Sequence, residues 1–236
     1  MSLPKMQYPT FRIVVPSTKK PMLFRPLLVK EEKILLMAKT GQDDIEILSA
    51  IKQIVNNCCE EPGFDVDKLT IFDLEYIFLK IRSNSIGNKV ELVFKDLEDE
   101  KDYKFEVDLN TVEIEYPKNA DNKIPVNDNT GVIMRYPSAA LYDDKSFLSM
   151  GQEALFELMI RCVDKIYKGD ELIDVSTYSH EDISNFIDNL DVKTFEKIDK
   201  FLSDAPKMRH VLTYRNSNNN ERKIELTTLT DFFTLR

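Results

Sequence analysis

The stretch RPLLVKEEKILLMA, residues 25–38, decides the fold near the start of this sequence because it joins an extended segment directly to a helix. Pro26 disfavours helical backbone at Arg25, and the pattern from Val29 onward is that of an amphipathic helix. Gly41 can adopt the left-handed conformation that closes a helix, so we expect this helix to end there. The stretch predicts structure and contains no chemical motif.

Strand patterns come immediately before this helix. TFRIVVP, residues 10–16, alternates polar and apolar side chains, and MLFRP, residues 22–26, can pair with it across a turn. Proline at positions 16, 21 and 26 lacks a backbone donor. We therefore predict a β-hairpin at a sheet edge.

Helical and then strand patterns follow. Residues 44–58 carry one apolar face, and Thr70 can cap a helix over 71–81 that is apolar on all sides. Alternation then predicts a central antiparallel meander of three strands, within residues 90–116. The acidic turn DLEDEKD, residues 96–102, is interpreted as a solvated loop tip, with a cation site as the alternative.

The second half of the sequence is more helical. A polar segment at 119–130 and the strand pattern GVIMRYP, 131–137, suggest two regions, 1–137 and 138–236, unless the chain forms one continuous domain. We predict helices over 146–167, from Ser179 (a capping box with Asp182) and over 193–203, and a closing β-hairpin after Pro206. The expected fold class is α+β.

Composition limits the functional classes. The 32 basic and 41 acidic residues give a net charge of -9 with interspersed signs, which argues against a nucleic-acid partner. Apolar runs are too short for a membrane span, and Pro4 and Pro9 interrupt the N-terminus where a signal peptide needs an apolar core. We therefore expect a protein that is neither secreted nor membrane-spanning.

The residues that carry chemistry are few. Cys58, Cys59 and Cys162 fit helix interiors in a reducing compartment, and His180 and His210 are isolated. The six glycines are scattered, so no phosphate-cradling loop is evident. We assign no catalytic residue, no cofactor and no metal ligand.

Two apolar features stand out as possible contact sites. The helix over 71–81 has Phe72, Tyr76 and Leu79 outside its main apolar stripe, and TLTDFFTLR, residues 228–236, contains Phe232 and Phe233. Phe232 and Phe233 can dock on the protein's own sheet or insert into a partner. As a hypothesis we take these five side chains as a partner-binding surface.

Several phrases in a fixed order carry a resemblance over residues 8–233. They are PTFRIVVPSTKKPMLFRPLLVKEEKILLMA, DIEILSAIKQIVNNC, LTIFDLEYIFLKIRSNSIGNKVEL, GVIMRYP and HVLTYRNSNNNERKIELTTLTDFF. In this respect the chain resembles the baseplate hub subunit, or hub assembly protein, of T4-like contractile-tailed bacteriophages.

The resemblance implies a viral protein made in the host bacterial cytoplasm that takes part in virion assembly. Its partners would be other baseplate hub or tape-measure proteins, and its role non-catalytic, that of a tail assembly chaperone. The alternative is a structural subunit retained in the tail baseplate of the virion; a tail-associated enzyme is a third class, for which no paired-carboxylate or metal pattern is found. The oligomeric state is left open.

Overall fold

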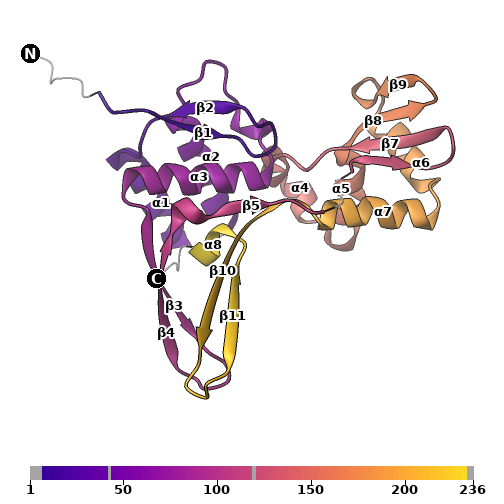
Figure 1. Cartoon of the computed structure of the whole chain (residues 1–236). Coiled ribbons are helices and arrows are strands. Elements are labelled where there is room, and N and C mark those ends of the chain that lie inside the picture. Colours follow the sequence, from indigo (N-terminus) through magenta and orange to yellow (C-terminus); the bar gives the residue numbers. More distant parts are fainter. Residues whose placement is uncertain (1–6, 42–43, 119–120, 233–236) are drawn as a thin grey trace, which may run out of the picture. The chain divides into compact units, whose positions relative to one another are not determined.

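The computed structural model describes residues 7–41, 44–118 and 121–232. Within these ranges, eight α-helices and eleven β-strands pack into two compact units (Figure 1). Unit 1 contains the described residues up to Glu115 and those from Lys207 onward, whereas unit 2 contains Tyr116–Pro206. The small antiparallel sheets and separate helices confirm the α+β class.

Unit 1 combines three antiparallel sheets with four helices in its described part. Its sheets have the strand orders β1-β2, β3-β4 and β11-β10-β5. The strands are β1 Phe11–Val14, β2 Pro21–Phe24, β3 Lys89–Lys95, β4 Asp102–Asp108, β5 Glu113–Glu115, β10 Lys207–Arg215 and β11 Glu221–Leu226. The helices are α1 Val29–Gly41, α2 Asp44–Cys58, α3 Ile71–Ser85 and α8 Leu229–Phe232.

The Arg25 guanidinium lies at the junction of β2, α1 and α2. Its Nη2 atom is 3.0 Å from Oε1 of Glu31, whose side chain is fully buried, and 2.7 Å from the carbonyl oxygen of Asn57 at the end of α2. Oε2 of Glu31 also accepts the N–H of Leu28 at 3.0 Å. Burial opposes ionisation of Glu31, but these hydrogen bonds outweigh it and lower the pKa of this carboxyl. The buried ion pair therefore fixes where α1 starts.

Helix α3 is the central helix of unit 1, and its first turn is fixed by a capping box. Thr70 Oγ1 accepts the N–H of Asp73, and the Asp73 carboxylate accepts the N–H of Thr70, each at 3.2 Å. The second carboxylate oxygen of Asp73 accepts the N–H of Ser17 at 2.8 Å, which holds the β1–β2 turn against the helix. Leu74, Ile77 and Ile81 are fully buried.

The predicted third strand of the meander pairs elsewhere. Strand β3 pairs with β4, whereas β5 pairs with β10, so that Ile114 lies opposite Met208. The C-terminal hairpin thereby becomes part of unit 1, and the two units divide the chain differently from the predicted regions 1–137 and 138–236. Alternation of side chains reveals a strand but not its partner, which explains the difference.

Unit 2 is a four-stranded antiparallel sheet, in the order β6-β7-β8-β9, with four described helices. The strands are β6 Lys123–Pro125, β7 Thr130–Met134, β8 Val163–Lys168 and β9 Glu171–Asp174. The helices are α4 Lys145–Leu148, α5 Ala154–Cys162, α6 His180–Asp188 and α7 Val192–Ser203. The unit has its own core, which includes Ile124, Val132, Met134, Met159, Ile187 and Ile198.

The predicted helix over 146–167 is wrong in extent. Gly151, at φ +59°, separates α4 from α5, and the helix ends at Cys162. The following residues VDKIYK alternate and form β8, with Ile166 opposite Ile173 of β9. Leu155, Met159, Cys162 and Ile166 fit helical spacing, and this pattern concealed the change of period.

The two helices predicted after this point are confirmed. Ser179 and Asp182 form the expected capping box at the start of α6. Helix α7 begins after Asp191, whose carboxylate accepts the N–H groups of Lys193 and Thr194. Local cap chemistry therefore fixes both helix starts in unit 2.

Candidate interaction sites

The four described side chains of the hypothesised partner-binding surface lie in or near the core of unit 1. Phe72, Leu79 and Phe232 are buried, and Tyr76 is half-buried with the ammonium of Lys80 above its ring at 5.1 Å. Phe233 lies outside the described residues. The burial of Phe232 favours docking on the protein's own fold, and contact of this surface with a partner stays a prediction.

Helix α8 is held beside α3 by a polar contact that is sensitive to pH. Oε1 of Glu75 accepts the N–H of Leu229 at 3.5 Å, and Asp231 caps the same turn by accepting the N–H groups of Thr227 and Thr228 at 2.8 Å each. Burial raises the pKa of Glu75 to about 7, and the nearby Asp231 carboxylate adds to this, although the Leu229 N–H opposes it.

The acidic turn at 96–102 is bound by the Asn-rich turn of the other hairpin, while most of its residues stay exposed to solvent, as predicted. Tyr214 Oη donates to Asp96 at 2.6 Å, and the side-chain amides of Asn216 and Asn220 donate to Glu98 at 2.8 and 2.6 Å. The N–H and hydroxyl of Ser217 donate to one oxygen of Asp99 at 2.9 and 2.8 Å. Hairpins β3–β4 and β10–β11 therefore lie side by side and form one arm (Figure 1).

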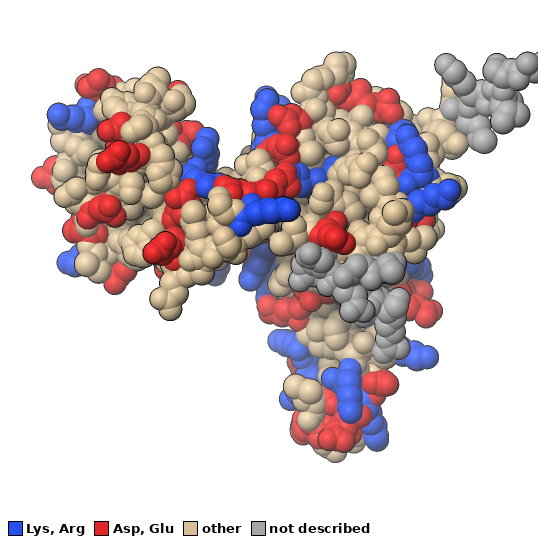
Figure 2. Space-filling view, turned by 180° about the vertical axis from the view of Figure 1, so that it is seen from behind, with Lys and Arg blue, Asp and Glu red and all other residues tan. Residues whose placement is uncertain are grey.

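This arm carries charge on its surface and one exposed apolar side chain at its end. Burial opposes ionisation of Asp99, but hydrogen bonds from Tyr103 and Ser217 outweigh it and hold its pKa well below the usual range. Figure 2 shows Lys, Arg, Asp and Glu side chains intermingled over the end of the arm. Leu97, in the acidic turn, is 89% exposed.

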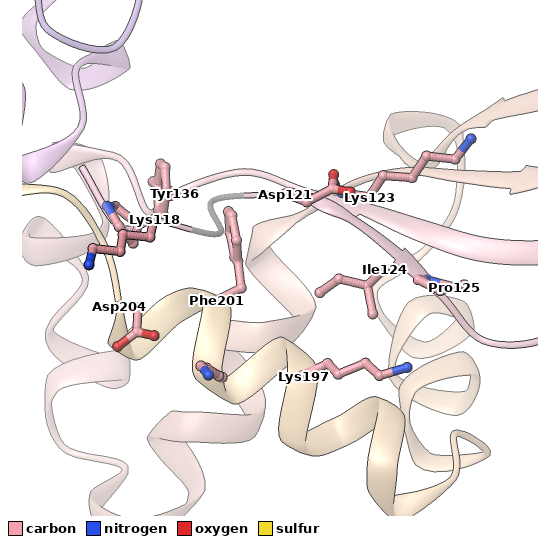
Figure 3. A pocket seen from close by; sticks show the side chains of 11 residues that line it. Lys118, Asp121, Lys123, Ile124, Pro125, Tyr136, Lys197, Phe201 and Asp204 are labelled. Atoms are coloured by element: carbon pink, nitrogen blue, oxygen red, sulfur yellow. Dashed lines mark hydrogen bonds between the residues drawn. The ribbon is translucent and has the colours of Figure 1, made fainter.

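Unit 2 contains an open cavity of about 540 Å³ between β6 and α7 (Figure 3). Ile124 and Phe201 are buried side chains of its wall, and the ring of Phe201 stacks on that of Tyr136 at 4.5 Å between centroids and 11° between planes. Burial, and to a lesser degree the charge of Asp204, raise the pKa of Tyr136. An apolar, aromatic wall thus faces the cavity.

The rim of the cavity is basic. Lys118, Lys123, Lys197 and Lys200 line it, together with the carboxylates of Asp121 and Asp204. The ammonium of Lys123 lies over the Tyr167 ring at 4.4 Å, whereas the other three lysines form no ion pair with any described residue. This site was not predicted from the sequence, because its lysines come from separate segments. The local signal is that Lys197, Lys200 and Phe201 lie on one face of α7 and Asp204 follows the helix directly.

Cys58 and Cys162 are buried, as predicted, and burial raises the pKa of their thiols to about 11 and 12. Such thiols are protonated at neutral pH and are poor nucleophiles. His180 lies on the surface of unit 2, where its Nε2 atom is 2.8 Å from Oε2 of Glu157, a carboxylate that also binds Arg161. These contacts stabilise the unit and do not assemble a catalytic group.

In the described part of the chain, His, Cys, Asp and Glu side chains form no group of three or more that could hold a metal ion. In the same part, every helix is too short or too polar to cross a bilayer.

The geometry defines a two-unit α+β protein whose distinctive features are an interlocked hairpin arm, a basic cavity and exposed apolar side chains. A family model described as T4 bacteriophage base plate protein matches residues 8–234. No curated protein and no solved structure matches the chain. The chain therefore belongs to the T4 bacteriophage base plate protein family, and this membership makes other phage tail proteins its partners.

Replacing Phe232 with Ala distinguishes the two interpretations of the C-terminal aromatic residues. Because Phe232 is fully buried, we expect the free energy of unfolding to fall by about 3–5 kcal/mol. Urea unfolding measures this change, with Thr230→Ala at an exposed position of the same helix as the control. Unchanged stability together with weaker binding to tail proteins would instead identify Phe232 as a partner anchor.

From the raised pKa of Glu75 we predict that the free energy of unfolding falls as the pH rises. Its pKa is about 7 in the folded protein and near 4.5 when unfolded, so the folded state binds more protons between these values. We expect up to about 3 kcal/mol of stability to be lost between pH 4.5 and 7, and little further change from this group above pH 8. Urea unfolding from pH 5 to 8 should show this slope in the parent and a flatter profile in Glu75→Gln; equal slopes would contradict the assignment.

Proposed function

We propose that this protein assists assembly of the central hub of the phage baseplate as a non-catalytic chaperone that binds other hub or tape-measure proteins. Family membership supports a role at the baseplate. The observation that carries the proposal is the outward face of α1, on which Val29, Leu36 and Met37 are 75%, 55% and 76% exposed.

This face has the geometry of a helix-binding or groove-binding surface. Positions 29, 33, 36 and 37 fall within one stripe of about 100° on a helix of 3.6 residues per turn. The opposite face carries Glu31 and Ala38, which are buried, and the Arg25–Glu31 ion pair fixes the helix start. The exposed stripe is therefore presented on a firmly held helix, and burying it would favour association with an apolar partner surface.

A structural subunit of the baseplate hub is the second candidate. The description of the matching family as a base plate protein favours it, because a subunit stays in the finished particle. A chaperone binds before assembly and then leaves, so it acts in the host cytoplasm. A tail-associated enzyme is the third class; turnover of peptidoglycan by the purified protein would support it and overturn the non-catalytic proposal.

Mass spectrometry of purified virions distinguishes the chaperone from the subunit. We expect peptides of this chain in hub intermediates from infected cells and only traces in purified virions, because a chaperone is released. Abundance in virions equal to that of the other baseplate proteins would establish the structural subunit. Fixed-stoichiometry baseplate proteins in the same sample serve as the internal standard.

The double substitution Leu36→Gln and Met37→Gln tests whether α1 contacts the partner. Both side chains are exposed, so we expect the free energy of unfolding to change by less than about 1 kcal/mol. Affinity capture from infected cells with quantitative mass spectrometry should show at least about tenfold less hub protein bound. The control is Leu172→Gln, at a 55% exposed position in unit 2; equal loss with this variant would argue against α1 as the contact face.

A further inference from the structure

We propose that the cavity between β6 and α7 of unit 2 binds an acidic segment of a partner tail protein that also contains an aromatic or other large apolar side chain. The proposal names a second contact and rests on the proposed function, in that the partner is a protein of the phage tail. It is carried by the aromatic wall and by three of the four rim lysines, Lys118, Lys197 and Lys200, which form no ion pair with any described residue.

The rim of the cavity is basic, whereas unit 2 as a whole is acidic. Unit 2 has 17 acidic and 10 basic side chains, a net charge of -7, but the cavity is lined by four lysines and two aspartates. Lys118, Lys197 and Lys200 have no carboxylate partner among the described residues, whereas Arg161 binds both Glu157 and Asp144. In an acidic unit, unpaired ammonium groups gathered at one cavity are a site for carboxylates.

The positions of the charged side chains along α7 determine at which end of the cavity a carboxylate of the ligand would bind. Lys197 and Asp204 are two turns apart, about 10 Å along the helix axis, and they lie at opposite ends of the cavity in Figure 3. Oδ1 of Asp121 already accepts the N–H of Lys123 at 2.9 Å. A carboxylate would therefore bind at the Lys197 end, because at the other end Asp204 lies beside Lys118 and offsets its charge (Figure 3).

The wall of the cavity explains why the ligand needs an apolar side chain. Ile124 and the stacked rings of Tyr136 and Phe201 form a surface on which an aromatic ring can stack, while the ammonium groups remain at the rim. The volume of about 540 Å³ lies in the range typical of ligand pockets and suits a short peptide segment.

A nucleic acid fits the cavity less well than a peptide. An extended phosphate backbone would pass over the rest of unit 2, where acidic side chains predominate and would repel it. A peptide of a few residues confines its carboxylates to the rim. The acidic surface of unit 2 outside the cavity therefore disfavours a nucleic acid and favours a short peptide whose charges stay at the rim.

Fluorescence anisotropy with labelled synthetic peptides tests the proposal on the full-length protein. The probe is a short peptide in which glutamates alternate with phenylalanines, and its matched control replaces every glutamate with glutamine. We expect saturable binding of the acidic peptide, weakened about 5- to 20-fold by Lys197→Gln with Lys200→Gln, because each exposed ion pair contributes only modestly. Lys145→Gln with Lys193→Gln removes the same charge from exposed positions outside the cavity and should leave binding unchanged.

Three results of the binding assay would overturn the proposal. They are absence of saturable binding, equal loss with both lysine pairs, and stronger competition by inorganic phosphate or single-stranded DNA than by the unlabelled acidic peptide. Peptide-independent self-association that is lost with Lys197→Gln and Lys200→Gln, seen by analytical ultracentrifugation, would also overturn it by assigning the cavity to a second copy. Failure here leaves the virion measurement unaffected, so the cavity and the hub role are tested separately.

Discussion

The pairing of β5 with β10 is the constraint on which the architecture depends. Glu115 lies opposite Lys207, and all of unit 2 lies between these two residues in the sequence. Because the two strands are neighbours, the segment between them must leave unit 1 and return at the same sheet. Arg209 reinforces the junction through ion pairs with Glu115 at 3.0 Å and Glu225 at 2.9 Å. Unit 2 can therefore fold around its own core as an insertion between adjacent strands.

Charged groups fix the geometry of unit 1 in two places, and in neither place do they assemble a reactive site. The Glu31 carboxylate is satisfied by Arg25 and by the N–H of Leu28, and the Asp99 carboxylate by Tyr103 and Ser217. The buried Arg25–Glu31 ion pair adds little net stability, because desolvation offsets its attraction, but every arrangement that leaves one partner alone is penalised. This ion pair specifies one placement of α1, and the hydrogen bonds of Asp99 specify one alignment of the two hairpins.

Local patterns predicted most of the elements, whereas long-range pairing could not be predicted from them. The capping residues Thr70 and Ser179 fixed two helix starts, and alternation found the strands of unit 1 and β7, but not β6, β8 or β9. Strand β8 was hidden because its apolar residues also fit helical spacing, whereas the partner of β5 could not be predicted because it lies in a distant segment. The hydrogen bond from Tyr214 to Asp96 also joins residues 118 positions apart, and a single sequence does not reveal such a contact.

The most apolar segments of the sequence were poor guides to the proposed contact surfaces. Helix α3 is apolar on all sides because it is the central helix of unit 1, so its apolarity reports burial. The exposed stripe of α1 is interrupted by Lys33, and the cavity of unit 2 combines aromatic rings with lysines. A protein that must remain dissolved before it meets its partner cannot expose a continuous apolar patch without aggregating. Its contact surfaces are therefore expected to mix apolar and charged side chains, and such surfaces resemble ordinary solvent-facing sequence until the fold brings their parts together.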